Sequence, residues 1–296
     1  MKPSKKKDVR RADRLFLGTL RSWAALIVLA LVSMGFFLFD ASELAIQKNG
    51  FLSFILSSDW DPVQDIYGAL PVIYGTLVSS LLSLCIAFPL SVGIALFLNE
   101  IAPSGLARVI GFLVEMLAAI PSVIYGLWGI FVLVPWVRLH VQPLFSGPAY
   151  GVGMFSAALI LSLMILPTIS SLAREVFAAI PRTQRESALA LGATRWEMMK
   201  LAVLKSSRGG LFAAMMLGLG RALGETMAVT MVIGNRAQIV RSLFAPAQTM
   251  ASVIANEYAE ATSDIHLSSL ALVGLLLFGV TFITSSIARL LIWRAK

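Results

Sequence analysis

The chain has 296 residues, of which 58% are hydrophobic and 14% charged, and its mean hydropathy is +0.84. Soluble domains carry about 25% charged residues, so this composition excludes an ordinary soluble domain and indicates a membrane protein. The net charge of +8 by itself would suit a nucleic acid or an anionic surface, so the positions of the basic residues decide its meaning.

Apolar runs recur along the chain, and each is close to the ~20 residues that cross a bilayer as a helix. We therefore predict an all-α integral membrane protein with six transmembrane helices. The predicted spans are 22–39, 72–98, 109–134, 151–172, 210–234 and 268–288.

The positions of the basic residues predict the orientation of these spans. With the N-terminus inside, the predicted outside segments hold only Lys48, Arg138, Arg236 and Arg241 of the 24 Lys and Arg. The positive-inside rule then places both termini in the cytoplasm. The basic tail 1–21 fits an inner-leaflet anchor better than a signal-peptide start or a nucleic-acid arm, because the apolar run behind it is long and lacks a convincing cleavage site.

Two of the predicted outside loops are notable. Loop 40–71 is acidic, and its Trp60 and Tyr67 suit an interfacial aromatic belt. Loop 235–267 is too polar to be a span, and it is either a solvated connector or a surface for a partner or a lid. His140 and His266 lie in outside segments, and we expect solvated side chains there and no metal site.

Three features inside the predicted spans carry structural expectations. Cys85 lies in mid-span as the one cysteine, so it forms no internal disulfide and is expected to be a packing residue. Pro121 must interrupt the third span, and Gly126 and Gly129 permit a close neighbour. Glu115, near the cytoplasmic end of that span, either snorkels, bonds to another helix or serves transport.

The cytoplasmic loop 173–208 is far longer than the ~2–8 residues that join helices in bundles. Segments 184–191 and 194–204 read as short helices, and Gly192 between them is able to take a positive φ and turn the chain. The second segment is amphipathic. It would lie on lipid or insert into a groove on another protein.

The stretch RESALALGATRWEMMKLAVLK in this loop resembles the EAA loop of ABC importer membrane subunits. Glu186, Ala188 and Gly192 match at the family spacing, and Ser187 stands where the family has its first alanine. At the end of the motif, Leu204 is retained, whereas Ala202 and Lys205 stand where the family tends to have isoleucine and proline. The resemblance implies that these residues form a coupling helix, which docks into a cleft of a separate ATPase subunit.

Three further stretches, DWDPVQDIYGALPVIYGTL, AAIPSVIYGLWGIFVLVP and GLGRALGETMAV, occur in this order. They are similar to the PstC-type permeases of bacterial phosphate ABC importers from about residue 55 onward. The resemblance implies a type I importer permease fold over 72–290 in the bacterial inner membrane. It also implies four kinds of partner: a second homologous permease, two ATP-binding subunits, a soluble phosphate-binding protein and membrane lipid.

Arg221 and Glu225 interrupt the fifth predicted span. Four residues apart on a helix, they would share one face, and that face should be turned to protein or water because charge is costly in lipid. One interpretation is an internal ion pair that fixes helix orientation. The other is that the planar, permanently charged Arg221 binds the passing anion. Glu225 would then neutralise Arg221 between substrates or accept a hydrogen bond from a protonated phosphate oxygen.

The sequence has no G-x-x-x-x-G-K-[ST] loop. We therefore expect a transport subunit that is no enzyme and needs no cofactor of its own, with ATP and Mg used by the partner ATPase. The alternatives are a secondary anion transporter or channel, which leaves the cytoplasmic loop unexplained, and a permease for sulfate, molybdate or phosphonate. A membrane enzyme would need a nucleophile with its base or a metal cluster, and neither pattern is visible.

Overall fold

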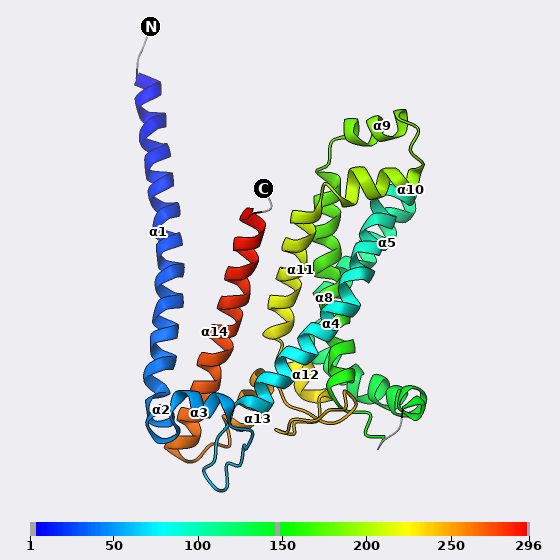
Figure 1. The fold of residues 1–296 in the computed structure, drawn as a ribbon. Helices are drawn as coiled ribbons and strands as arrows, with labels where there is room; N and C mark the ends of the chain where they lie inside the picture. The colour runs from blue at the N-terminus through cyan, green and yellow to red at the C-terminus, as the bar shows by residue number, and fades with distance from the viewer. Residues whose placement is uncertain (1–3, 146–148, 295–296) are drawn as a thin grey trace.

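The computed structural model describes residues 4–145 and 149–294. Long helices lie side by side over most of its length, and only isolated β-bridges occur among these residues (Figure 1). Helices are expected because a backbone surrounded by lipid must satisfy its polar groups within its own segment. The long helices are α1 (Ser4–Ala41), α4 (Leu70–Leu96), α5 (Ser104–Ala119), α8 (Met154–Ala178), α11 (Arg208–Leu223) and α14 (Asp264–Arg294).

Short helices mark the two ends of the molecule (Figure 1). Helices α9 (Arg182–Ala190) and α10 (Arg195–Met198) lie at the same end as both chain termini. Helices α2 (Glu43–Asn49), α3 (Phe51–Leu56) and α13 (Met250–Glu257) lie at the other end. The predicted outside loops are thus not plain connectors, because each folds partly into helix.

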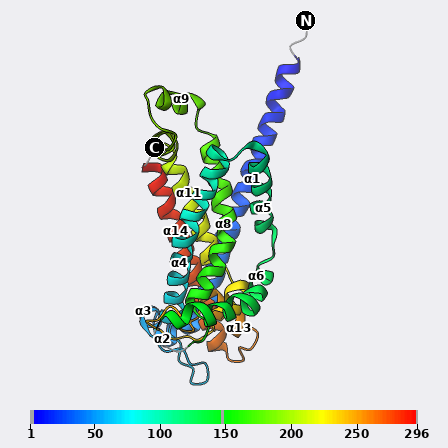
Figure 2. The same cartoon turned by 90° about the vertical axis from the view of Figure 1, so that its right-hand side faces the viewer.

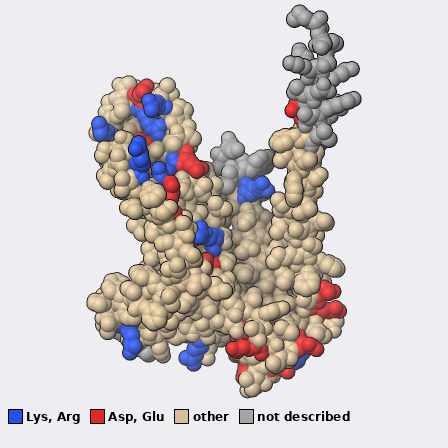
Figure 3. Space-filling view, turned by 180° about the vertical axis from the view of Figure 1, so that it is seen from behind, with Lys and Arg blue, Asp and Glu red and all other residues tan. Residues whose placement is uncertain are grey.

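Charged side chains follow the same division. Lys and Arg gather over α9 and α10, whereas Asp and Glu predominate around the base of α1, and a broad surface with few charges lies between (Figure 3). Such a belt of few charges is what a membrane-embedded surface requires.

Among residues 4–145 and 149–294, five helical stretches are long and apolar enough to cross a membrane. They are Phe16–Ala41, Leu70–Ile101, Ser122–Leu144, Met154–Ala178 and Asp264–Leu290. The predicted continuous span 210–234 is wrong, because α11 ends at Leu223 and α12 (Met227–Val232) begins after a break. The predicted span 109–134 is divided as well, between α5 and α6 (Ser122–Trp128), and Pro121 lies at the interruption where we expected one.

The main core forms around α8, which packs against α4, α11 and α12. The two glycines after Pro121 permit the expected close approach. A Cβ atom at Gly126 would lie 2.6 Å from the sulfur of Met231, and one at Gly129 would lie 2.7 Å from a methyl group of Val232. Helix α12 therefore packs directly onto the α6 region.

Helix α1 stands apart from this core. It contacts α14 and α2, and in both views it leaves the bundle toward its N-terminal end (Figures 1 and 2). Its apolar side chains remain exposed, Phe36 by 72% for example. Cys85 is exposed too, so the expectation that it packs inside this chain is wrong.

A second cluster, at the end that carries α2, α3 and α13, corrects the predictions made for three residues. Trp60 donates from Nε1 to both carboxylate oxygens of Glu257, at 3.2 and 3.0 Å, and its ring contacts Tyr67 edge-on. Tyr67 is only 2% exposed and stacks on His266, which is 8% exposed and bonds to Glu257 at 3.0 Å. The three side chains join two predicted loops instead of facing lipid or solvent. Trp60 bonds to Glu257, and Tyr67 and His266 stack on each other, so each contacts a residue that is distant in sequence.

Candidate functional site

Arg221 lies in the last turn of α11, and a glycine sets its position. Gly218, one turn earlier, is buried against α8, where a Cβ atom would lie 2.6 Å from two carbon atoms of Ile169. This close approach brings Nη1 of Arg221 to 3.0 Å from Oγ1 of Thr168 on α8, to which it donates a hydrogen bond. The sequence signalled the arginine but not the threonine.

The other side of Arg221 is open. A Cβ atom at Gly220 would meet nothing within 4 Å, and Gly224 is exposed. Leu217 is 56% and Met227 53% exposed on the same part of the chain. One face of α11 and the break that follows is therefore left uncovered by the described residues, and the guanidinium is exposed on it.

We had expected Glu225 to share a helical face with Arg221, but it does not. Gly224 ends α11, and Oε1 of Glu225 accepts a hydrogen bond from the backbone N–H of Ala228 at 3.4 Å. Among the described residues, no ion pair joins Arg221 to Glu225. The internal pair that competes with anion binding is thus absent in this conformation, and Glu225 instead serves the first turn of α12.

The helix-turn-helix predicted within segment 173–208 is confirmed. Gly192 has a φ of +85° between α9 and α10, and α10 continues into η5 (Met199–Leu204). Thr194 and Glu197 form a capping box, in which the backbone N–H of Thr194 donates to Glu197 at 2.8 Å. This hydrogen bond is the main cause that lowers the pKa of Glu197 below its ordinary value.

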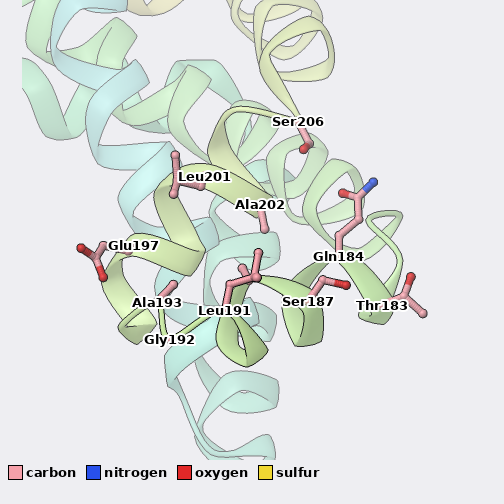
Figure 4. A pocket seen from close by; sticks show the side chains of 11 residues that line it. Thr183, Gln184, Ser187, Leu191, Gly192, Ala193, Glu197, Leu201, Ala202 and Ser206 are labelled. Carbon is pink, nitrogen blue, oxygen red and sulfur yellow. The ribbon is translucent and has the colours of Figure 1, made fainter.

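A hollow of about 780 Å³ separates α9 from η5 (Figure 4). Leu191, which directly follows α9, points toward Ala202 across it, whereas the carboxylate of Glu197 points away. Of the EAA-like residues, Ser187, Ala188 and Gly192 line the hollow, and Glu186 is exposed outside this lining.

The two helices bordering the hollow are held differently. Residues of α10 and η5 such as Met198 and Val203 are buried in a core with Phe177 of α8. Helix α9 has no buried residue. An ion pair attaches α9 to the rest of the molecule, with Nη2 of Arg185 at 2.8 Å from Oε1 of Glu100. This pair is a second feature that the sequence did not predict.

Glu115 bonds to another helix, one of the possibilities left open. Its Oε1 lies 3.5 Å from Nη1 of Arg174 on α8, and both side chains are partly exposed. Among residues 4–145 and 149–294, no group of three His, Cys, Asp or Glu is placed to hold a metal ion.

Comparison with known proteins agrees with this geometry. Residues 91–296 match the model of the family described as binding-protein-dependent transport system inner membrane component. The chain belongs to this family. The phosphate transport system permease protein PstC of Mesorhizobium japonicum is 45% identical and aligns with 99% of this chain and 95% of its own length.

A second relative agrees with this assignment, and one solved structure shares the fold. The phosphate transport system permease protein PstC of Pasteurella multocida is 47% identical, with 96% of this chain and 92% of that protein covered. A crystal structure of a bacterial alginate ABC transporter, in complex with its alginate-bound periplasmic protein, contains a chain of the same fold. It has a TM-score of 0.64 at 19% identity over 95% of this chain and 94% of that chain. The permease is thus a multi-pass inner-membrane protein.

Proposed function

We propose that this permease forms one half of the pathway of an ATP-driven inorganic phosphate importer and is coupled to separate ATPase subunits. The observation that carries the proposal is a guanidinium, Arg221, exposed on an uncovered face of a predicted membrane helix. A charge at the bilayer centre costs roughly 2.5–3.5 kcal/mol on insertion scales, so this face should not meet lipid.

A second permease is the partner that suits this face. Two such subunits placed face to face would enclose Arg221 in a pathway with room for an anion beside Gly220, where nothing lies within 4 Å of a Cβ position. The planar fork of arginine matches the oxygens of an oxyanion in a bidentate manner. One nitrogen bonds to Thr168, which would hold the fork in place while the rest of it binds substrate.

Coupling would take place at the end that carries α9 and α10. Both chain ends lie there, and Lys and Arg gather there (Figures 1 and 3), which supports a cytoplasmic position by the positive-inside rule. The two ATP-binding subunits would dock on Glu186, Ser187, Ala188 and Gly192 and use ATP and Mg themselves. A soluble phosphate-binding protein would dock at the opposite end, and lipid would surround the belt.

The sixth crossing is part of the proposal. Helix α11 and helix α12 would together cross the membrane, with the break at 224–226 near mid-depth. ATPase closure would move the docked α9 and α10 as a rigid body and alternate access around Arg221.

Phosphate is favoured among oxyanions because the matched relatives are named phosphate permeases. Sulfate, molybdate and phosphonate remain alternatives that the charge of Arg221 alone does not distinguish. Glu225 provides a test, since its carboxylate would accept a hydrogen bond from a protonated phosphate oxygen, which ionised sulfate lacks. Unchanged phosphate uptake and unchanged rejection of sulfate in Glu225→Gln would rule out this role.

The decisive experiment is uptake of labelled phosphate into vesicles that carry the reconstituted complex, with and without ATP inside. We expect ATP-dependent uptake by the parent and its loss in Arg221→Gln with the ATPase subunits still bound. Gly192→Trp should lose ATPase binding, because the turn between α9 and α10 has a positive φ that tryptophan rarely adopts. Uptake that is independent of ATP and driven by an ion gradient would favour a secondary transporter.

A further inference from the structure

Arg185 makes an unusually complete set of contacts for a charged residue in a surface helix. Its Nε donates to both carboxylate oxygens of Glu100 at 3.2 Å, and its Nη2 donates to Oε1 at 2.8 Å. The same guanidinium donates to the carbonyl of Ile180 at 2.6 Å and of Phe177 at 2.8 Å. The side chains are only 17% and 7% exposed, so solvent screens the pair weakly.

Helix α9 has little else to hold it. No residue of α9 is buried, Leu189 and the following Leu191 are exposed, and the hollow of about 780 Å³ lies beneath it. Ala188 provides its packing contact with the core under η5. Helix α9 also contacts α10 and η5, but among the described residues Arg185 is the one member of α9 whose side chain forms hydrogen bonds to segments outside it.

Glu100 links this connection to the bundle. It lies in η1 (Phe97–Ile101), which continues α4 directly. Helix α4 in turn packs against both α8 and α11, and Ser91 donates to the carbonyl of Leu166 on α8 at 3.0 Å. Leu166 lies two residues before Thr168, the partner of Arg221. The chain of contacts from α9 thus ends at the helices that position the candidate anion site.

We propose that Arg185 is a positioning residue that makes α9 move together with the cytoplasmic end of α4, so that displacement of the coupling helix reaches the transmembrane helices. The inference rests on the proposed function. Phe177 and Ile180 add the end of α8 to the same rigid unit, because one guanidinium bonds to all three segments. Lysine has no planar fork and holds only part of this set.

The test measures phosphate transported per ATP hydrolysed, at saturating ATP, in vesicles carrying the complete complex. Arg185→Gln should keep ATP hydrolysis within about twofold of the parent and lose at least about tenfold in phosphate per ATP, a loss that corresponds to about 1.4 kcal/mol of coupling. Arg185→Lys should restore part of this ratio. Arg174→Gln is the matched control, because it breaks an exposed ion pair with Glu115 at the same end of the molecule.

A variant that leaves Glu100 buried without its partner is at risk of misfolding. The double variant Arg185→Gln with Glu100→Gln removes both charges and should assemble while showing the same loss of ratio. A ratio within twofold of the parent in either variant would overturn the inference, and so would failure of both to assemble, because the pair would then serve folding alone. If the parent itself shows no ATP-dependent phosphate uptake, the proposed function fails instead.

Discussion

The placement of Arg221 depends on a glycine with no space beside it, and substitution of that glycine should report the packing directly. In Gly218→Ala the new Cβ would lie 2.6 Å from two carbons of Ile169. Carbon atoms pack at about 3.5–4.0 Å, so α11 and α8 must separate by about 1 Å or Ile169 must move. Ile169 has no exposed surface into which it might turn.

Two contributions to stability oppose each other in this variant. Alanine is favoured over glycine in a helix by up to ~1 kcal/mol, whereas overpacking a filled core costs ~1–3 kcal/mol. Gly220→Ala is the matched control in the same helix, because its Cβ would meet nothing within 4 Å in this chain. It gains the helix preference without the clash. The free energies of unfolding of the two variants should thus differ by about 1–3 kcal/mol, with Gly218→Ala the less stable.

The measurement is denaturant unfolding of the isolated permease in detergent, since the proposed second permease would face Gly220 in the complex. Reconstituted Gly218→Ala should also lose phosphate uptake, because a shift of about 1 Å lengthens the hydrogen bond from Arg221 to Thr168 beyond a bonding distance. Equal stability of the two variants would refute the packing that we assign to Gly218.

Three further substitutions test particular contacts. Thr168→Val removes the acceptor for Arg221 and should lower phosphate uptake about tenfold, since a hydrogen bond to a charged group is worth ~1.5–3 kcal/mol; uptake within twofold of the parent would contradict this. Trp60→Phe keeps most of the ring but loses the bonds to Glu257, and denaturant unfolding should show a loss of ~1.5–3 kcal/mol. Burial raises the pKa of Tyr67 above 10, so the stability that it confers is complete below that pH and is lost as the pH rises through the folded pKa. Thermal unfolding of Tyr67→Phe should therefore fall less steeply above pH 10 than that of the parent.

The sequence predicted the features that depend on local composition. Apolar runs located most of the long helices, and Gly192 marked the turn between α9 and α10 because few other residues tolerate its φ of +85°. Pro121 likewise predicted an interruption of the helix, since proline removes a backbone hydrogen-bond donor wherever it lies in a helix.

Contacts between distant segments could not be predicted in the same way. Arg221 bonds to Thr168 and Arg185 to Glu100, and nothing in the local pattern of either arginine names its partner. The same holds for His266. We predicted a solvated side chain because no partner lies in its local sequence pattern, whereas the fold places Glu257 and the ring of Tyr67 against it.

The break after α11 was missed for a related reason. Apart from Arg221, Glu225 and Thr226, the residues from 217 to 229 are small or apolar and suit a continuous helix. A glycine within such a run ends a helix only when the surroundings favour it. Here α12 packs against Gly126 and Gly129, and this packing stabilises the chain with the helix broken. Arg221 and Glu225 then lose the shared helical face on which their predicted pairing depended.

The break bears on how the uncovered face must be used. Irregular backbone at membrane depth is tolerated only where it is buried in protein or lines a water-filled cavity, because lipid offers no hydrogen bonds. Glu225 and Thr226 lie in this irregular stretch, directly after the helix that carries Arg221. Exposed charge and exposed irregular backbone independently disfavour lipid at the same place. Since both features exclude this face from contact with lipid, they support the proposal that it forms the wall of a pathway completed by a second subunit.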